Sequence, residues 1–556
     1  MTRSLTAICV ALAAGTALAQ DTIIVPDDFP TLEDALDPAI SSIDPGDTIV
    51  LRDSLTHFGT FVVTVPDLTI EAAAGDLPVL DANGAGSVIT VDIGNGELTL
   101  VGLTIQDARG AGIDVDEASR VSVQGCVIQD NNADGNGGGM FGADVSFVID
   151  DSFFIENSAG DGGAIRSQGS SPITIRNSEF IGNTASRDGG VLSYAGDGNQ
   201  RVRVEDSVFE DNAANDRGGA LHIRNANEFV IERTTFTANT AIGLNRSDAG
   251  AIFMDTIDNG TVADSDFVGN LANGEGGAIL SLLDTAGGNS VDYVNTRFAD
   301  NEASASTIAV FGGTCDFVNC EFVNNTSLRA GDGIEVGGAV RYRTSPGGQR
   351  SFGSILNCLF DGNLANQGGA IGLGTSTVSI TNSTFVNNAA LDIGDAIVGI
   401  ASGTDVTIFN NVFADNGSDP IELTGGTRVT RFNLFDVNDT IGGTESDNLF
   451  GVNPLFVEAS ASDYALQAGS PAIDAGNSDL YGFGPFTDLA GNPRGQDDPD
   501  TADTGSARTG PVIDMGAFEF NVNSGVADCP ADQNFDGQLT PGDFSAWVLN
   551  FNAGCD

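Results

Sequence analysis

The sequence predicts an all-β fold: a right-handed parallel β-helix of about 14 coils, with a cap at each end and a small EF-hand-like helical tail. The main indication is a motif that occurs ten times, in which a phenylalanine is followed three residues later by an asparagine. The chain also contains 73 glycines, as expected of many tight turns. Successive phenylalanines of this motif are 24 to 38 residues apart. Its asparagines are Asn157, Asn183, Asn212, Asn239, Asn270, Asn301, Asn325, Asn363, Asn388 and Asn416.

A second motif, two glycines followed by two small or apolar residues, keeps step with the first. Clear copies begin at Gly162, Gly218, Gly276, Gly337 and Gly368. Short alternating runs separated by Gly, Asn and Asp lie between the motifs, as expected of strands joined by tight turns. Because short strands in one repeat cannot bury an apolar face alone, the repeats are expected to stack about 4.8 Å apart.

Stacking places equivalent positions of successive coils in columns. The phenylalanines should share one inner column, and the asparagines should form another, in which each amide donates a hydrogen bond along the rod axis. Asn also tolerates the left-handed backbone that a sharp corner needs, so these asparagines are expected to be structural. The residue two before each Phe is small or polar enough to face the same interior, and it is cysteine at Cys320 and Cys358.

The cysteines divide into two groups. Cys126, Cys320 and Cys358 are expected to be buried free thiols, although a disulfide between Cys320 and Cys358 in neighbouring coils stays open, as does the state of Cys315. Cys529 and Cys555 bracket the end of the chain and are predicted to form a disulfide. Export permits such bonds.

The order of segments predicts five parts. Residues 1–19 have a signal peptide's positive start, apolar stretch and small-residue cleavage site, which predicts export. Residues 20–52 form an N-terminal cap with a strand at 22–25 and an amphipathic helix around 32–40, and residues 53–451 form the β-helix. Residues 452–520 form a C-terminal cap, with a polar, flexible loop at 495–510, and residues 526–556 form the tail module.

Charge narrows the range of partners. The chain has 77 acidic and 22 basic residues, a formal net charge of -55, and every basic residue is arginine. Such a field repels phosphate backbones and anionic membrane surfaces, so nucleic acid is not an expected partner. Apart from the signal peptide, the sequence has no apolar run of the length that a transmembrane helix requires.

The tail has the ligand spacing of an EF-hand loop. The expected ligands of one Ca²⁺ ion are Asp532, Asn534, Asp536, Gln538 (through its backbone carbonyl), Thr540 and Asp543. Hard oxygen ligands suit Ca²⁺, and Gly537 allows the sharp turn in the middle of the loop. A short helix is expected to follow from residue 543 to residue 550.

Three resemblances follow from these motifs. The paired Phe-x-x-Asn and Gly-Gly-Ala-Ile motifs over residues 126–440 resemble chlamydial polymorphic outer membrane protein repeats, which implies a β-helix with an adhesive role. Residues 21–52 look like the entry segment of pectate-lyase-like β-helix proteins, and residues 452–520 resemble the closing segment of many secreted bacterial β-helix proteins. The tail, with Asp543 in the twelfth loop position, resembles Cys-bracketed dockerin-like modules of planctomycete exported proteins. It has one repeat where cellulosomal dockerins have two, which implies sorting or surface attachment.

Two features of the sequence are candidates for a ligand-binding or catalytic role. The first is a carboxylate that precedes the Gly-Gly corner in five consecutive coils, at Asp161, Asp188, Asp216, Asp248 and Glu275. Stacked carboxylates would repel one another. They are expected either to splay into solvent or to form a ridge that binds Ca²⁺ or sugar. His222 is expected at the surface, with no nucleophile pattern near it.

The sequence therefore favours a non-catalytic protein at the cell surface or outer membrane, which binds a glycan or adheres to a surface component. Its tail would engage sorting or anchoring machinery. The alternative is a polysaccharide-degrading lyase or glycoside hydrolase with a dockerin-like targeting module. An Asp/Glu pair with an arginine in a groove would favour the enzyme, whereas an unbroken, shallow, polar face would favour the binder.

Overall fold

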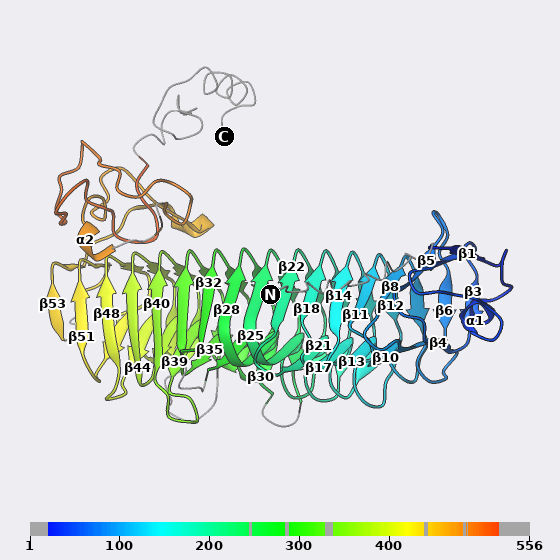
Figure 1. Cartoon of the computed structure of the whole chain (residues 1–556). Helices are drawn as coiled ribbons and strands as arrows, with labels where there is room; N and C mark the ends of the chain where they lie inside the picture. The colour runs from blue at the N-terminus through cyan, green and yellow to red at the C-terminus, as the bar shows by residue number, and fades with distance from the viewer. Residues whose placement is uncertain are drawn as a thin grey trace, which may run out of the picture.

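The computed structural model describes residues 20–243, 247–283, 288–328, 337–438, 443–481, 485 and 487–521. Over these residues the chain winds into the predicted right-handed parallel β-helix of about 14 coils (Figure 1). Every strand pair between coils is parallel and pairs a strand with its equivalent in the next coil. The predicted fold class is thus confirmed for the coils, while the helical tail and residues 1–19 lie outside the described residues.

Three parallel sheets form the walls of the solenoid. The largest has 29 strands in two columns, which the long strands β25 and β28 connect. Its strands are β1 (Thr22–Val25), β2 (Thr48–Leu51), β4 (Phe61–Val63), β5 (Leu68–Ala72), β7 (Ile89–Asp92), β8 (Glu97–Val101), β10 (Ile113–Glu117), β11 (Arg120–Gln124), β13 (Met140–Ala143), β14 (Ser146–Asp150), β17 (Ile165–Gly169), β18 (Ile173–Arg176), β21 (Leu192–Gly196), β22 (Arg201–Glu205), β25 (Leu221–Glu232), β28 (Ile252–Ala263), β31 (Ile279–Leu282), β32 (Ser290–Val294), β35 (Ile308–Phe311), β36 (Thr314–Val318), β39 (Val340–Arg343), β40 (Ser351–Leu356), β43 (Ile371–Leu373), β44 (Ser376–Thr381), β47 (Ile397–Gly399), β48 (Asp405–Phe409), β50 (Ile421–Leu423), β51 (Arg428–Arg431) and β53 (Thr444–Ser446).

The second sheet has 16 strands and carries the phenylalanines of the repeat. Its strands are β3 (Thr56–Phe58), β6 (Val79–Asp81), β9 (Thr104–Gln106), β12 (Val127–Gln129), β15 (Phe153–Ile155), β19 (Glu179–Ile181), β23 (Val208–Glu210), β26 (Thr235–Thr237), β29 (Asp266–Val268), β33 (Arg297–Ala299), β37 (Glu321–Val323), β41 (Leu359–Asp361), β45 (Thr384–Val386), β49 (Val412–Ala414), β52 (Leu434–Phe435) and β54 (Leu449–Phe450).

The third sheet has nine short strands, each just after an asparagine of the repeat. They are β16 (Ser158–Ala159), β20 (Thr184–Ala185), β24 (Ala213–Ala214), β27 (Thr240–Ala241), β30 (Leu271–Glu275), β34 (Glu302–Ala305), β38 (Thr326–Ser327), β42 (Leu364–Gln367) and β46 (Ala389–Ile393). Outside the coils lie the antiparallel pair β55 (Phe456–Glu458) and β56 (Asp463–Leu466), the helices α1 (Leu32–Leu36) and α2 (Ser478–Tyr481), and the 3-10 helix η1 (Ala459–Ala461).

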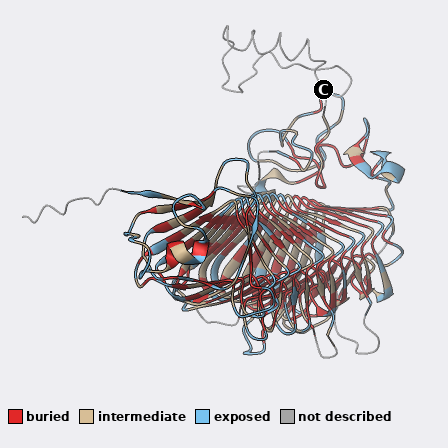
Figure 2. Ribbon diagram, turned by 90° about the vertical axis from the view of Figure 1, so that its right-hand side faces the viewer, coloured by how far each residue is buried: buried red, intermediate tan, exposed pale blue. Residues whose placement is uncertain are grey.

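An unbroken stack of aromatic rings runs through the core of the solenoid from Phe154 to Phe450. The ten phenylalanines of the repeat form one inner column that continues through Phe435 to Phe450, with neighbouring ring centroids 4.7 to 5.2 Å apart and planes within 17°. Figure 2 shows the buried residues along the inside of the coils. Each ring inside the column stacks on the rings of both neighbouring coils, so the stacking inferred from the repeat is confirmed.

The sharp corners differ in one detail from the prediction. The left-handed backbone does not fall on the repeat asparagine but on the residue before it, for example Glu156, Asp211 and Ala238 with φ of 50°, 54° and 54°. The asparagine itself turns its amide inward instead. The expectation that Asn adopts the left-handed conformation was therefore wrong, although the corner is where the repeat places it.

The two ends of the chain are built differently. Helix α1 is a single turn that ends at Leu36, shorter than predicted, because Asp37 precedes Pro38 and is extended. The closing segment 452–520 lies along the flank of the last coils (Figure 1), where Ala517 N donates to Thr384 Oγ1 at 2.9 Å. No helix among the described residues is long and apolar enough to cross a membrane.

Candidate functional site

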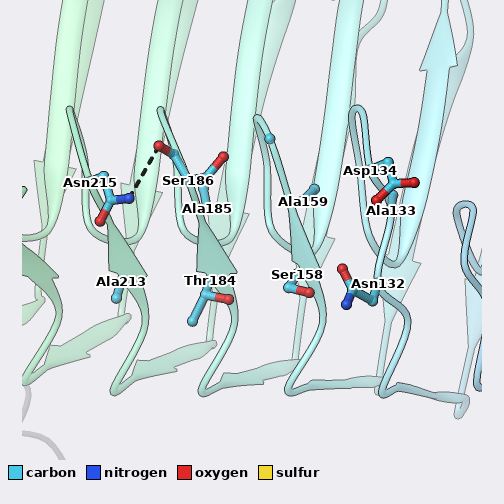
Figure 3. Close-up of a pocket in the computed structure, with 11 residues that line it drawn as sticks. Asn132, Ala133, Asp134, Ser158, Ala159, Thr184, Ala185, Ser186, Ala213 and Asn215 are labelled. Atoms are coloured by element: carbon cyan, nitrogen blue, oxygen red, sulfur yellow. Dashed lines mark hydrogen bonds between the residues drawn. The ribbon is translucent and has the colours of Figure 1, made fainter.

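A groove runs across four consecutive coils of the nine-stranded sheet (Figure 3). Its volume is about 420 Å³, and it is lined by Asn132, Ala133, Asp134, Ser158, Ala159, Gly160, Thr184, Ala185, Ser186, Ala213 and Asn215. Figure 3 shows two rows of side chains, one with Asn132, Ser158 and Thr184 and the other with Asp134 and Asn215. We call this surface the groove.

The repeat asparagine creates the groove. Asn157 and Asn183 turn inward, and each donates from Nδ2 to Oδ1 of the asparagine in the next coil at 3.0 Å. Two residues later comes a buried alanine, Ala159 or Ala185, whose short side chain leaves the bend hollow. The sequence carried this signal, because alanine recurs two residues after most repeat asparagines, but the groove was not predicted from it.

The second glycine of each corner brings neighbouring coils into close contact behind the groove. A Cβ added to Gly163 would lie 2.2 Å from the carbonyl oxygen of Gly190 and 2.4 Å from that of Thr184. A side chain there would push apart two coils that line the groove. The Gly-Gly motif thus sets the close coil spacing that positions the polar residues of both rows.

Next to the groove, the predicted column of carboxylates is interrupted by arginine. The backbones of Asp188 and Asp248 both form parallel β-bridges with the backbone of Arg217 in the coil between them, so Arg217 and not Asp216 occupies the column there. The charge of Arg217 acts on Asp188 and lowers its pKa against the effect of burial. Arg187 Nη2 lies 2.5 Å from Asp161 Oδ2. The mutual repulsion expected of a carboxylate stack is therefore relieved by arginine side chains.

At the far end of this column Glu275 is almost fully buried. Its Oε2 lies 3.5 Å from Arg341 Nη1, and its Oε1 lies 3.7 Å from Arg343 Nη1. Asp188, nearer the groove, is partly buried, and burial raises its pKa while Arg217 opposes the rise. The arginine pairs of Asp161 and Glu275 were not part of the sequence-based expectation, and binding of Ca²⁺ or sugar by this ridge stays a prediction.

His222 was expected at the surface, and that prediction was wrong. Its side chain points outward from β25 but is only 3% exposed, because Phe253 of the next coil packs edge-on against its ring at 5.3 Å. Asp188 Oδ2 lies 3.4 Å from Nδ1, yet neither ring nitrogen has a hydrogen-bond partner among the described residues. Burial, reinforced by Arg217, lowers the pKa of His222 to about 3. A histidine that holds its proton so weakly and is so inaccessible is a poor general acid.

Replacing His222 by phenylalanine should make the protein less sensitive to acid. In the unfolded chain His222 takes up a proton near pH 6.5, whereas in the folded protein it does so only near pH 3. Acid therefore favours the unfolded state: the contribution of the neutral ring to the free energy of unfolding is fully present above pH 6.5 and is lost as the pH falls towards 3. Between pH 7 and pH 5 this loss is about 2 kcal/mol. Thermal unfolding of both proteins at the two pH values should show that the wild type loses about 2 kcal/mol more of its free energy of unfolding between pH 7 and pH 5 than the His222→Phe variant does. A difference that does not change with pH would contradict it.

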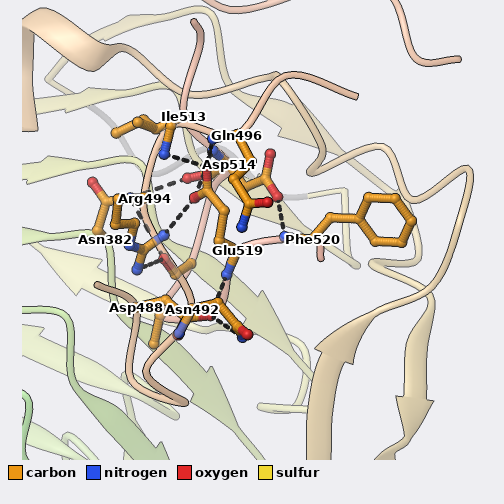
Figure 4. A network of polar contacts seen from close by, with 12 residues as sticks. Asn382, Asp488, Asn492, Arg494, Gln496, Ile513, Asp514, Glu519 and Phe520 are labelled. Carbon is orange, nitrogen blue, oxygen red and sulfur yellow. Dashed lines mark hydrogen bonds and ion pairs between the residues drawn. The ribbon is translucent and has the colours of Figure 1, made fainter. Parts of the chain in front are cut away.

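A second polar cluster holds the closing segment together (Figure 4). Arg494 Nη1 lies 3.1 Å from Glu519 Oε2, and both side chains are buried. Glu519 N donates to Asp488 Oδ2 at 2.8 Å, and Asp514 N donates to Glu519 Oε2 at 3.3 Å. Burial and the neighbouring charge of Glu519 raise the pKa of Asp514 well above its usual range. Asn382 of the β-helix donates to Asp514 O at 3.0 Å, so this cluster fastens the segment to the coils.

The remaining predicted site residues have these positions. All ten repeat asparagines lie buried in one hydrogen-bonded column, with Nδ2 to Oδ1 distances of 2.9 to 3.0 Å between coils. Cys126, Cys315, Cys320 and Cys358 are buried free thiols, and Cys320 N donates to Cys358 Sγ at 3.4 Å. The predicted Ca²⁺ ligands Asp532, Asn534, Asp536, Gln538, Thr540 and Asp543 and the pair Cys529 and Cys555 lie outside the described residues.

Residues 87–248 match a family model described as a right-handed β-helix region. No curated protein matches the chain. Among solved structures, the chain is similar to a mannuronic acid-specific polysaccharide family 6 lyase from human gut microbiota, with 15% identity, 60% of this chain and 86% of that chain covered, and a TM-score of 0.29.

It is also similar to an alginate lyase in complex with G6, with 13% identity, coverage of 73% and 88%, and a TM-score of 0.34. A third similar structure is a PL6 family polysaccharide lyase from Pseudopedobacter saltans, with 12% identity, coverage of 81% and 96%, and a TM-score of 0.33. At these identities and TM-scores no activity and no residue is transferred to this chain.

Proposed function

We propose that this protein is exported, is held at the cell surface, and binds a glycan in the groove without cleaving it. The observation that carries the proposal is the composition of the groove. Of its eleven lining residues only Asp134 is ionisable, and the rest are amides, hydroxyls, alanine and glycine. A glycosidase needs two carboxylates that flank the scissile bond, and the lining supplies one.

The groove suits a sugar chain chemically. The side chains of Asn132, Ser158, Thr184 and Asn215 both donate and accept hydrogen bonds, as sugar hydroxyls do. The alanine floor offers apolar contact to the C–H face of a sugar ring. Coils about 4.8 Å apart repeat at close to the length of one sugar unit in an extended chain, so successive sugars can meet successive coils.

Charge selects among glycans. With a formal net charge of -55 and Asp134 in the groove, the protein repels a polyanionic chain. No arginine lines the groove. The ligand is therefore a neutral or cationic glycan, and an adhesive role like that of the polymorphic outer membrane protein repeats would use this surface.

The tail would supply the attachment. We propose that Asp532, Asn534, Asp536, Gln538, Thr540 and Asp543 hold one Ca²⁺ ion and that Cys529 and Cys555 form a disulfide, as in a dockerin-like module. The spacing of oxygen-bearing residues in the sequence supports this. The module would engage sorting or anchoring machinery after the signal peptide, residues 1–19, is removed.

A second candidate function rests on the charges beside the groove. Asp161 and Asp188 lie near Arg187. They are close to the groove, because Gly160, the residue before Asp161, is one of the residues that line it. This is the carboxylate and arginine combination of a polysaccharide-degrading lyase. However, the Arg187 guanidinium is paired with Asp161, and an arginine seldom loses its proton.

Replacing Thr184 by tryptophan should weaken glycan binding at least tenfold, because the indole fills the centre of the groove. Thr184 is exposed, so the fold should tolerate the change. The measurement is a glycan array followed by titration of the best neutral ligand, together with a polysaccharide depolymerisation screen with and without Ca²⁺.

The matched control is Thr326→Trp. Thr326 is the equivalent residue five coils further along the same sheet and does not line the groove. It should bind like the wild type. Equal affinity of the Thr184→Trp variant and the wild type would refute the groove as the binding site. Depolymerisation that is lost in an Arg187→Gln variant would establish the enzyme instead.

A further inference from the structure

Three aspartates of the closing segment converge outside the groove and outside the tail. Asp474 belongs to the stretch after β56, and Asp497 and Asp503 belong to the loop 495–510. One carboxylate oxygen from each lies within 4.8 Å of the other two. Asp474 is fully buried, whereas Asp497 and Asp503 are exposed. We call these three residues the aspartate triad.

The loop that carries two of the three is fixed against the third. Thr504 N and Gly505 N donate to the carbonyl oxygen of Asp474 at 2.9 and 3.0 Å. Asp498 N donates to Asp474 Oδ2 at 3.2 Å. The loop predicted to be polar and flexible is thus hydrogen-bonded to Asp474 next to Asp497 and again next to Asp503.

The other oxygen of Asp474 lacks a partner. Asp474 Oδ1 has no exposed surface and no hydrogen bond within the described part of the chain. A buried carboxylate oxygen without a donor is costly, and the Asp474 carboxylate also lies close to two further carboxylates. A hydrogen-bond donor or a positive charge between the three groups would remove that cost.

We propose that the aspartate triad binds a Ca²⁺ ion. Ca²⁺ takes oxygen ligands at 2.3 to 2.6 Å, so two ligands on opposite sides of the ion are roughly 4.6 to 5.2 Å apart. Three oxygens as far as 4.8 Å apart lie about 2.8 Å from a common centre, so a small inward shift of the exposed Asp497 and Asp503 side chains brings all three within Ca²⁺ bonding distance. Mg²⁺, with shorter bonds, spans roughly 4.2 Å and demands stricter geometry. The exposed side of Asp497 and Asp503 leaves room for water to complete the coordination.

The ion would lock the closing segment. Asp474 N donates to Asp514 Oδ1 at 2.8 Å, and Asp514 belongs to the buried cluster that fastens the segment to the β-helix (Figure 4). Bound Ca²⁺ thus links the exposed loop 495–510 to the flank of the last coils. This site is separate from the proposed tail site and independent of glycan binding.

The test is calorimetric titration of the mature full-length chain with Ca²⁺ after removal of metal by EDTA. The tail site is first disabled by Asp532→Ala and Asp536→Ala, and this background should still bind one Ca²⁺ ion. Adding Asp497→Asn and Asp503→Asn, both at exposed positions, should weaken binding at least tenfold. Asp500→Asn, exposed in the same loop but outside the triad, should leave the affinity unchanged.

A thermal measurement gives a second readout. Asp474→Asn removes the buried charge, so in EDTA this variant should unfold at a higher temperature than its parent, while Ca²⁺ should no longer raise its unfolding temperature. Absence of Ca²⁺ binding by the tail-disabled background at millimolar concentration would overturn the proposal. So would unchanged affinity in the variant with both Asp497→Asn and Asp503→Asn.

Discussion

Replacing Asn239 by alanine is expected to destabilise the central coils by about 4 kcal/mol. Its Nδ2 donates to Asn270 Oδ1 at 3.0 Å and to Phe209 O at 2.9 Å, while its Oδ1 accepts from Asn212 N and Nδ2 at 3.2 and 3.0 Å. Alanine would remove all four bonds and leave buried groups unpaired in three neighbouring residues, each at about 1–3 kcal/mol. The measurement is thermal or urea unfolding of the purified protein, monitored by circular dichroism.

Asn273→Ala is the matched control for this experiment. Asn273 lies three residues beyond the repeat position and is exposed, and its side chain donates from Nδ2 to Gly243 O at 3.3 Å. Its loss should change stability by no more than about 0.5 kcal/mol. If both substitutions cost the same, the asparagine column does not stabilise the coils in the way inferred here.

The columns were predictable because the sequence repeats them in phase. Phe209 and Asn212 recur with fixed separation in each unit, and only stacking buries both in every coil. The left-handed residue before the asparagine was only partly marked in the sequence. It is Gly, Asp or Asn in eight of the ten coils, but Glu156 and Ala238 in the other two.

Side-chain orientation was predicted better than burial. Alternation along β25 correctly directs His222 outward, but it does not tell what lies over that face. Phe253 in the next coil and Asp188 at the corner cover the imidazole. These contacts join residues some 30 positions apart, and no local pattern links them. Contacts between coils, and not the strand's own pattern, therefore determine the burial of His222.

The closing segment shows the same limit. The sequence showed an ordered series of motifs in this segment, but it did not show that Arg494 and Glu519 pair inside a buried cluster or that Asp514 contacts Asn382. Residue 382 precedes residue 514 by 132 positions. Likewise the aspartate triad unites residues from two separate stretches of the chain, and residues 495–510 were predicted only as a polar, flexible loop.

Gly190→Ala should be strongly disruptive, because it affects both the fold and the groove. A Cβ at this position would lie 2.0 Å from the carbonyl oxygen of Gly219, in the next coil. It would also lie 2.7 Å from Ala213 O and 2.8 Å from Ala213 N, and Ala213 lines the groove. These are backbone atoms that cannot rotate away, so two coils must separate.

The expected result for Gly190→Ala is a loss of at least about 3 kcal/mol, beyond the usual cost of overpacking because backbone and not side chain is displaced. Glycan binding should fall with it, since the polar rows of the groove depend on the coil spacing. Gly86→Ala is the control: an added Cβ there meets nothing within 4 Å and the backbone is not left-handed, so stability should stay level or rise by about 0.5 kcal/mol. Unfolding temperatures and titration with the same neutral glycan compare the two variants. A Gly190→Ala protein as stable as the Gly86→Ala protein would show that the coils can move apart without cost, and the groove could then not be held open by their close stacking.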